Sequence, residues 1–221
     1  MIYIVILPLL FICLFTIYEL CKDDFLLIRR DVKLSLIFNY ILLSFFVAFI
    51  TARIVFIIDS NKTFLINPLL FFHLINYGGL SIFGGFLGGV FSLLVMFSEK
   101  KIAGRMLDIS SLAFYPFLLP YIFLKPFSDF PLLLKFIAVL LLIVIFNVLL
   151  RFHKEYSLKD GSIFLYVFIL FSSLNIFYGF FNPHYVIFWK LSFSQFLSIF
   201  WILFSLIMFI LRTRDYFFKK T

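Results

Sequence analysis

The chain has 221 residues, of which 64% are hydrophobic and only 14% are charged, with a formal net charge of +8. Soluble proteins are roughly 45–50% hydrophobic, and a soluble domain of this length could not bury so much apolar surface in one core. The composition therefore excludes a soluble globular domain. The positive charges lie in short loops, where they cannot assemble one basic face, so we expect no nucleic-acid partner.

Seven stretches are apolar enough to cross a bilayer, which takes about 20 residues of helix. They are residues 2–20, 34–58, 80–97, 107–124, 131–150, 163–181 and 191–211. A shorter apolar segment, 64–75, has a length that suits the membrane interface. Pro116 and Pro120 predict a kink in the fourth span. We therefore predict an all-α integral membrane protein with seven transmembrane helices, forming a single domain over residues 1–221.

Lysines and arginines set the expected orientation, because the cytoplasmic loops of membrane proteins carry the excess of positive charge. The N-terminus and the second, fourth and sixth loops hold three: Lys62, Lys125 and Lys190. The first, third and fifth loops and the tail hold fourteen: Lys22, Arg29, Arg30, Lys33, Lys100, Lys101, Arg105, Arg151, Lys154, Lys159, Arg212, Arg214, Lys219 and Lys220. This alternation predicts an N-terminus outside and a C-terminus in the cytoplasm, and it supports seven spans.

Arg53 lies inside the second span, about five residues from its outer end and so about 8 Å below the surface. A charge at that depth is costly and marks a candidate functional site. Its planar guanidinium suits a phosphate or a carboxylate. Alternatively, the side chain extends outward to the lipid headgroups, and the sequence leaves both interpretations open.

Glycines open the third span: Gly78, Gly79, Gly84, Gly85, Gly88 and Gly89. Four of them form two G-x-x-x-G pairs, which favour close helix packing. Alternatively, the bare backbone admits a lipid or substrate.

The sixth span carries small and polar residues on one helix face: Ser172, Asn175, Gly179 and Asn182. They predict either hydrogen bonds between helices or one wall of a site. We expect Arg53, the glycine run and this face to meet in one pocket that opens toward the outer half of the bilayer. The histidines are scattered, so we expect no metal site and no cofactor: His73, His153 and His184.

Several motifs follow one another in a recognisable order: Ala52-Arg53, Asn67-Pro68, Gly78-Gly79-Leu80-Ser81-Ile82-Phe83-Gly84-Gly85, Asp108, Gly161–Asn182 and Leu191–Gln195. This order resembles the prolipoprotein diacylglyceryl transferase family of bacteria over about half of the chain. The resemblance implies seven spans in the bacterial cytoplasmic membrane. It also implies transfer of a diacylglyceryl group from phosphatidylglycerol to a lipoprotein cysteine at the outer leaflet.

The partners implied are phosphatidylglycerol or another phospholipid and the signal peptide of a lipoprotein precursor. The candidate substrate-binding residues are Arg53, Gly78, Gly79, Ser81, Gly84, Gly85, Asn175 and Asn182. Asp108, near the start of the fourth span, is interpreted as a helix-start residue.

Some positions of the family pattern carry other residue types here. Phe83 stands where the family has a histidine, and the Asn face of the sixth span stands where the family has Arg and Glu. Neutral asparagine cannot supply the charge of arginine to a phosphate. Two hypotheses follow: a divergent transferase, and a non-catalytic relative that binds lipid or a partner membrane helix in the same groove. A transporter is less favoured, because the sequence shows neither an inverted repeat nor paired charges deep in the spans.

Overall fold

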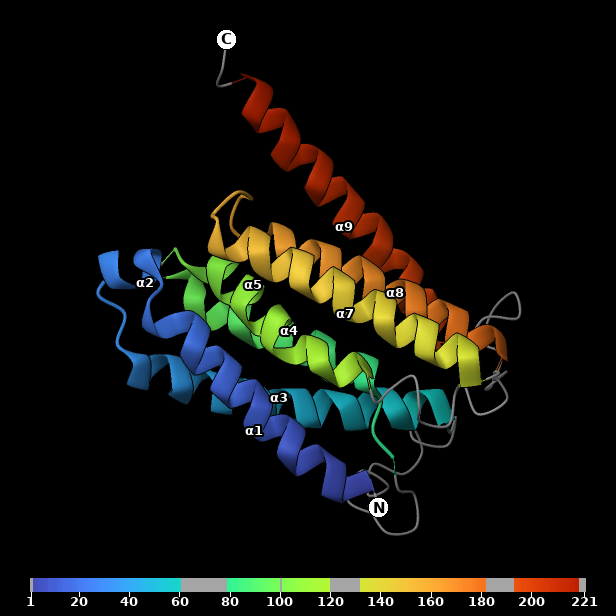
Figure 1. The fold of residues 1–221 in the computed structure, drawn as a ribbon. Helices are drawn as coiled ribbons and strands as arrows, with labels where there is room; N and C mark the ends of the chain where they lie inside the picture. The colour runs from blue at the N-terminus through green and yellow to red at the C-terminus, as the bar shows by residue number, and fades with distance from the viewer. Residues whose placement is uncertain (1, 61–78, 100, 120–131, 182–192, 219–221) are drawn as a thin grey trace. The chain divides into compact units, whose positions relative to one another are not determined.

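The computed structural model describes residues 2–60, 79–99, 101–119, 132–181 and 193–218. They form eight α-helices and one short 3-10 helix (Figure 1), which confirms the all-α prediction for these residues. The predicted interfacial segment, 64–75, and two candidate site residues, Gly78 and Asn182, lie outside the described residues.

Six long helices lie at the positions of six predicted spans. They are α1 (Ile2–Lys22), α3 (Leu34–Ser60), α4 (Ile82–Ser98), α7 (Leu132–Lys154), α8 (Ser162–Phe181) and α9 (Phe193–Phe218). The helix α9 extends beyond the predicted end at residue 211, and that all six cross a membrane stays a prediction. Two segments within the described chain are long and apolar enough to cross a membrane, Leu34–Ile58 of α3 and Lys135–Lys154 of α7. The α7 helix leaves large apolar side chains uncovered, with Leu133 71% exposed and Leu140 62% exposed, as expected of a surface that faces lipid.

The fourth predicted span differs in its boundaries. The helix α5 covers Ala103–Phe114, so it begins before residue 107, and it continues into the 3-10 helix η3 at Tyr115–Phe117. Pro116 lies in η3, where its missing backbone N–H interrupts the α-helical hydrogen bonds. The sequence predicted a kink at this position, and the structure has a change of helix type there.

The first loop contains a helix that the sequence pattern did not indicate, α2 (Phe25–Arg29). Asp24 precedes it as the N-cap, because its Oδ1 accepts hydrogen bonds from the backbone N–H groups of Leu26 (3.0 Å) and Leu27 (3.2 Å). The Leu27 side chain is buried.

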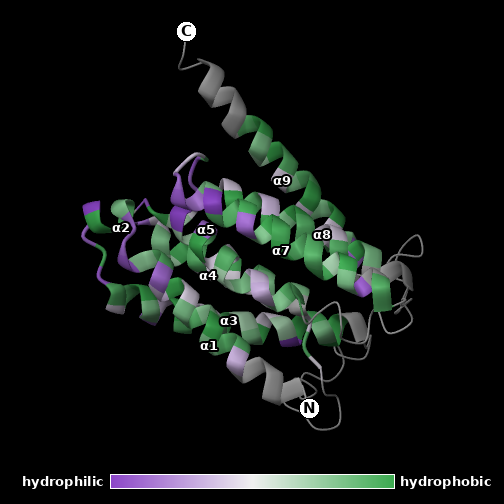
Figure 2. Ribbon diagram, in the orientation of Figure 1, coloured by the Kyte–Doolittle hydropathy of each residue, from purple (hydrophilic) through white to green (hydrophobic). Residues whose placement is uncertain are grey.

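The contacts divide the chain into two compact units. The first comprises Met1–Ile37 and Phe97–Val167, and the second comprises Phe38–Met96 and Phe168–Thr221. In the first unit α5 packs against α1, η3 and α7, and its side chains from Arg105 to Ala113 are all buried. Figure 2 shows that the hydrophilic residues of this unit gather where α2, the start of α5 and the α7–α8 connection lie.

Candidate functional site

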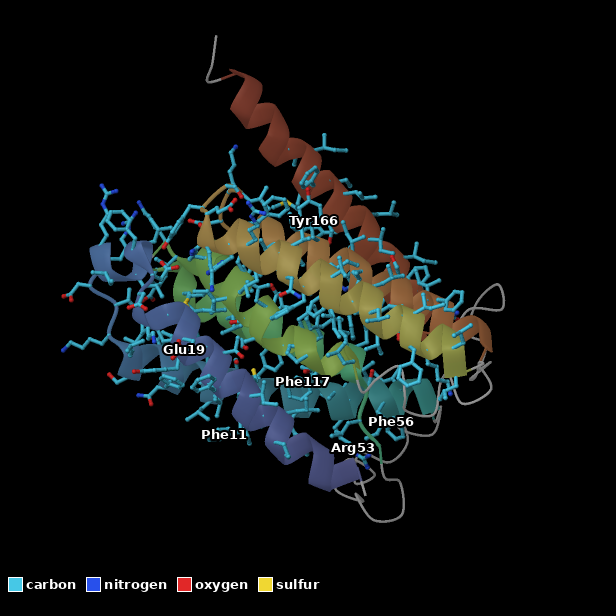
Figure 3. All side chains as sticks on the ribbon, in the orientation of Figure 1. Phe11, Glu19, Arg53, Phe56, Phe117 and Tyr166 are labelled. Atoms are coloured by element: carbon cyan, nitrogen blue, oxygen red, sulfur yellow. The ribbon has the colours of Figure 1, made fainter. Side chains whose placement is uncertain are left out.

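The second unit places Arg53 against the segment that leads into α4 (Figure 3). Arg53 is 0% exposed, and its Nη1 donates a hydrogen bond to the carbonyl oxygen of Gly79 at 3.0 Å. Its guanidinium carbon lies 5.7 Å from the centre of the Phe56 ring, and a Cβ at Gly79 would overlap that ring. The Ala52 carbonyl accepts the backbone N–H of Ser81 at 3.0 Å. Two consecutive residues of α3, Ala52 and Arg53, are therefore hydrogen-bonded to the segment that precedes α4.

Ser81 is the N-cap of α4. Its Oγ accepts the backbone N–H of Gly84 at 3.2 Å, which satisfies one of the free donors in the first helical turn. The N-terminus of a helix carries a partial positive charge. The guanidinium of Arg53 is bonded to Gly79, two residues before Ser81, so two sources of positive potential meet at one turn. Such a place favours an anion.

Gly84 and Gly88 lie on the face of α4 that packs against α3. A Cβ at Gly84 would stand 2.8 Å from the backbone oxygen of Thr51 and 2.6 Å from the Cβ of Val55. A Cβ at Gly88 would overlap the Thr51 side chain. Any side chain at these two positions would therefore force the helices apart.

Gly85 and Gly89 face α3 less tightly. A Cβ at Gly85 would lie 3.3 Å from the Cβ of Ala52, and one at Gly89 would lie 3.6 Å from the Cβ of Ala48. Of the two interpretations of the glycine run, close helix packing is the one that these contacts support. A role for Gly84 and Gly85 in binding substrate stays a prediction.

An aromatic cluster around Phe83 joins α4 to α8 within the second unit. Phe83 is 2% exposed, and its ring stacks on that of Phe171 with the ring centres 6.1 Å apart and the planes 8° apart. The ring of Phe86 lies 5.2 Å from that of Phe168 and 5.0 Å from that of Phe171. Phe83 is thus a core residue of the second unit.

Asn175 takes part in the contact between α8 and α9. Its side chain is buried, and its Nδ2 donates to the Oγ of Ser198 at 2.7 Å. One residue along, the carbonyl of Ile176 accepts the Nε2 of Gln195 at 3.2 Å. These bonds support the interpretation of the polar face of α8 as a helix-joining surface, and a role for Asn175 in substrate binding stays a prediction.

A buried charge cluster in the first unit was not predicted. Arg105, counted from sequence only as a loop charge, is 3% exposed and lies against the 1% exposed carboxylate of Asp24. Its Nε and Nη2 both lie 2.7 Å from Asp24 Oδ2. Nη2 also donates to the carbonyl of His153 at 3.4 Å, and Nη1 lies 3.8 Å from the carboxylate of Asp160.

Asp108 has a different role from the predicted one. It lies within α5, not at its start, and it caps another helix. Its Oδ2 accepts the N–H of Gly161 at 2.6 Å, and its Oδ1 accepts the N–H of Phe164 at 2.8 Å. Gly161 directly precedes α8 and Phe164 lies in its first turn, where backbone N–H groups have no partner within the helix. Arg105 and Asp108, three residues apart on α5, thus fix the elements around the α7–α8 connection.

A comparison with protein families identifies the chain. The model of the family described as prolipoprotein diacylglyceryl transferase matches residues 3–125, more than half of the sequence. The protein belongs to this family. The family acts in the bacterial inner membrane on a phospholipid donor and a lipoprotein substrate, so this member is a membrane protein. No curated protein and no solved structure matches the chain.

The family match includes Arg53, the Gly79–Gly85 stretch and Asp108, and it ends before α7. The sequence resemblance at Gly161–Asn182 and Leu191–Gln195 lies beyond it and stays a prediction.

Proposed function

We propose that this family member binds phosphatidylglycerol at the junction of α3 and α4 and transfers its diacylglyceryl group to the cysteine of a lipoprotein precursor. The observation that carries the proposal is the buried guanidinium of Arg53, bonded to Gly79 just before the N-terminus of α4. Both the guanidinium and the helix terminus attract a phosphate. Gly78, Ser81, Gly84, Gly85, Asn175 and Asn182 complete the proposed site.

The reaction needs a positive charge at the phosphate. The cysteine sulfur forms a bond to the glyceryl carbon, and the bond from that carbon to the phosphate oxygen breaks. The electron pair of the broken bond leaves with the glycerol phosphate, and the thiol proton passes to water or to that phosphate. A fixed cation stabilises the charge that develops on the leaving phosphate. Arg53 is the residue to which we assign this role.

A transfer assay tests the proposal. Purified protein in vesicles that contain phosphatidylglycerol is given a peptide with a lipobox cysteine, and the diacylglyceryl thioether is measured. Arg53→Gln should lower the rate by about 10²–10³-fold, the usual effect of removing one donor to a developing anion. Arg53→Lys keeps the charge but loses the planar guanidinium, so its transfer rate should lie between the rates of the unchanged protein and of Arg53→Gln.

Arg151→Gln is the matched control, because Arg151 is 78% exposed and pairs with Glu155 on the surface of α7. It should keep the rate of the unchanged protein. Absence of transfer by the unchanged protein, or a full rate for Arg53→Gln, would contradict the proposed activity.

One observation favours a second candidate, a non-catalytic relative that binds the same phospholipid. Phe83, where the sequence resemblance leads us to expect a histidine, is buried and stacked on Phe171. A phenyl ring has no proton to donate or accept in catalysis. This candidate predicts binding of phosphatidylglycerol without transfer, and weaker binding by Arg53→Ala. Transfer by the unchanged protein would exclude it, and equal lipid binding by Arg53→Ala would count against both candidates.

We further propose that the chain crosses the bacterial cytoplasmic membrane seven times as one domain, with its N-terminus outside. The alternation of lysine and arginine between successive loops supports this topology. It predicts that a cysteine at position 62 reacts with a membrane-impermeant thiol reagent in intact cells, whereas one at position 33 reacts only after the membrane is opened. The opposite pattern, or reaction at both positions in intact cells, would refute the topology.

A further inference from the structure

The five-residue helix α2 makes several contacts with distant parts of the chain. Its N-cap, Asp24, pairs with the buried Arg105. The first N–H of α2, at Phe25, donates to the hydroxyl of Tyr156 at 3.1 Å, and the ring of Tyr156 lies 4.4 Å from the guanidinium carbon of Arg105. Leu27 is 2% exposed. Contacts from Arg105 of α5 and from Tyr156, just after α7, therefore fix the orientation of α2.

The outer side of this fixed helix is apolar. Phe25 is 62% exposed and Ile28 is 64% exposed. They are three residues apart, so they lie on the same side of the helix. Together the two large side chains form a small exposed apolar surface on one side of α2.

Positive charges adjoin this apolar side. Arg29 ends α2, Arg30 follows it and Lys33 precedes α3, and all three side chains are exposed. Two exposed acids, Asp23 and Asp31, lie in the same stretch, so the local charge is positive by a small margin. Apolar side chains next to arginines and lysines are typical of segments that lie in the headgroup region of a membrane with anionic lipids.

We propose that α2 is an interfacial anchor. Phe25 and Ile28 insert where the acyl chains meet the headgroups, and Arg29, Arg30 and Lys33 bind the phosphates of anionic lipids beside them. The buried Arg105–Asp24 pair sets the angle at which the anchor meets the membrane. This inference depends only on membership in a membrane-protein family, and it is independent of the phosphate site proposed at Arg53.

Spin labelling of the full chain tests the anchor. Cys13 and Cys21 are replaced by alanine, and a single cysteine is placed at position 28 or 25, or at Asp23 as the control. The labelled proteins are put into nanodiscs of phosphatidylcholine with or without phosphatidylglycerol. The depth of each label is measured from its collisions with oxygen, which enters the bilayer, and with an aqueous nickel complex, which does not.

The label at position 28 should lie about 5–10 Å inside the headgroup boundary, and the label at position 23 should lie in water. The label at position 28 should lie deeper in nanodiscs that contain phosphatidylglycerol than in nanodiscs of phosphatidylcholine alone. The double variant Arg29→Gln, Arg30→Gln should show no such difference in depth. Equal access of nickel to positions 23 and 28 would overturn the proposal. So would protection of position 28 from both oxygen and nickel, because that result would mean that a protein covers the face. The label at position 25 repeats the test if the variant at position 28 does not fold.

Discussion

Alanine substitutions along α4 would measure how closely this helix packs on α3. Gly88 and Gly89 lie inside α4, so each gains about 1 kcal/mol of helix propensity on becoming alanine, and Gly84, in the first turn, gains less. The difference between the variants at Gly88 and Gly89 therefore reports packing. A Cβ at Gly89 makes an ordinary contact 3.6 Å from the Cβ of Ala48, so Gly89→Ala should keep most of this gain.

The other two positions have no room for a methyl group. A Cβ at Gly84 would lie 2.8 Å from the Thr51 backbone oxygen, and one at Gly88 would overlap the Thr51 side chain. Overpacking of this kind costs about 1–3 kcal/mol. Gly84→Ala and Gly88→Ala should thus be less stable than Gly89→Ala by about 1–3 kcal/mol in their free energy of unfolding.

Thermal unfolding of the detergent-solubilised protein would rank the variants. Adding Thr51→Ala removes the Oγ1 and Cγ2 that crowd Gly88, so it should partly restore the stability of Gly88→Ala. It should not restore Gly84→Ala, because the Thr51 backbone oxygen and the Val55 side chain remain in place. Equal melting temperatures for Gly84→Ala, Gly88→Ala and Gly89→Ala would refute the close contact of α3 and α4.

Three further experiments test other contacts. Arg105→Met should cost about 3–5 kcal/mol of unfolding free energy, because it leaves the Asp24 carboxylate buried without its charge partner. Adding Asp24→Leu should recover part of this loss. If the losses of the two single variants simply add in the double variant, the pairing is contradicted. Asp108→Asn should cost about 1–3 kcal/mol and speed hydrogen exchange at the start of α8, whereas unchanged exchange would argue against the cap. A double-mutant cycle of Asn175→Ala and Ser198→Ala should give a coupling of about 0.6 kcal/mol, and zero coupling would remove their hydrogen bond as a helix contact.

The long helices could be predicted from the sequence because each one must satisfy its own backbone hydrogen bonds in lipid. The ends of a long apolar stretch therefore predict the approximate ends of the helix, as they do for α3 and α7. The helix α2 could not be predicted in this way, since five residues show no periodicity. It forms because Asp24 caps it and because Arg105, far away in sequence, fixes that cap.

The candidate site could be predicted from the sequence only in part. Arg53 was selected as a candidate because a charge inside an apolar stretch is visible in the sequence. Its hydrogen bond to Gly79, 26 residues away, depends on how α3 and α4 pack, and no local pattern records it. Asp108 was misinterpreted for the same reason, because the helix that it caps begins more than fifty residues later in the chain.

The central claim, that Arg53 and the start of α4 hold a lipid phosphate, is tested most directly by photocrosslinking with a phosphatidylglycerol that carries a photoreactive group on its headgroup. Crosslinked peptides identified by mass spectrometry should map to the segment from Gly79 to Gly85, and Arg53→Gln should remove most of these adducts. Adducts that map elsewhere, or an unchanged yield on this segment with Arg53→Gln, would contradict the claim.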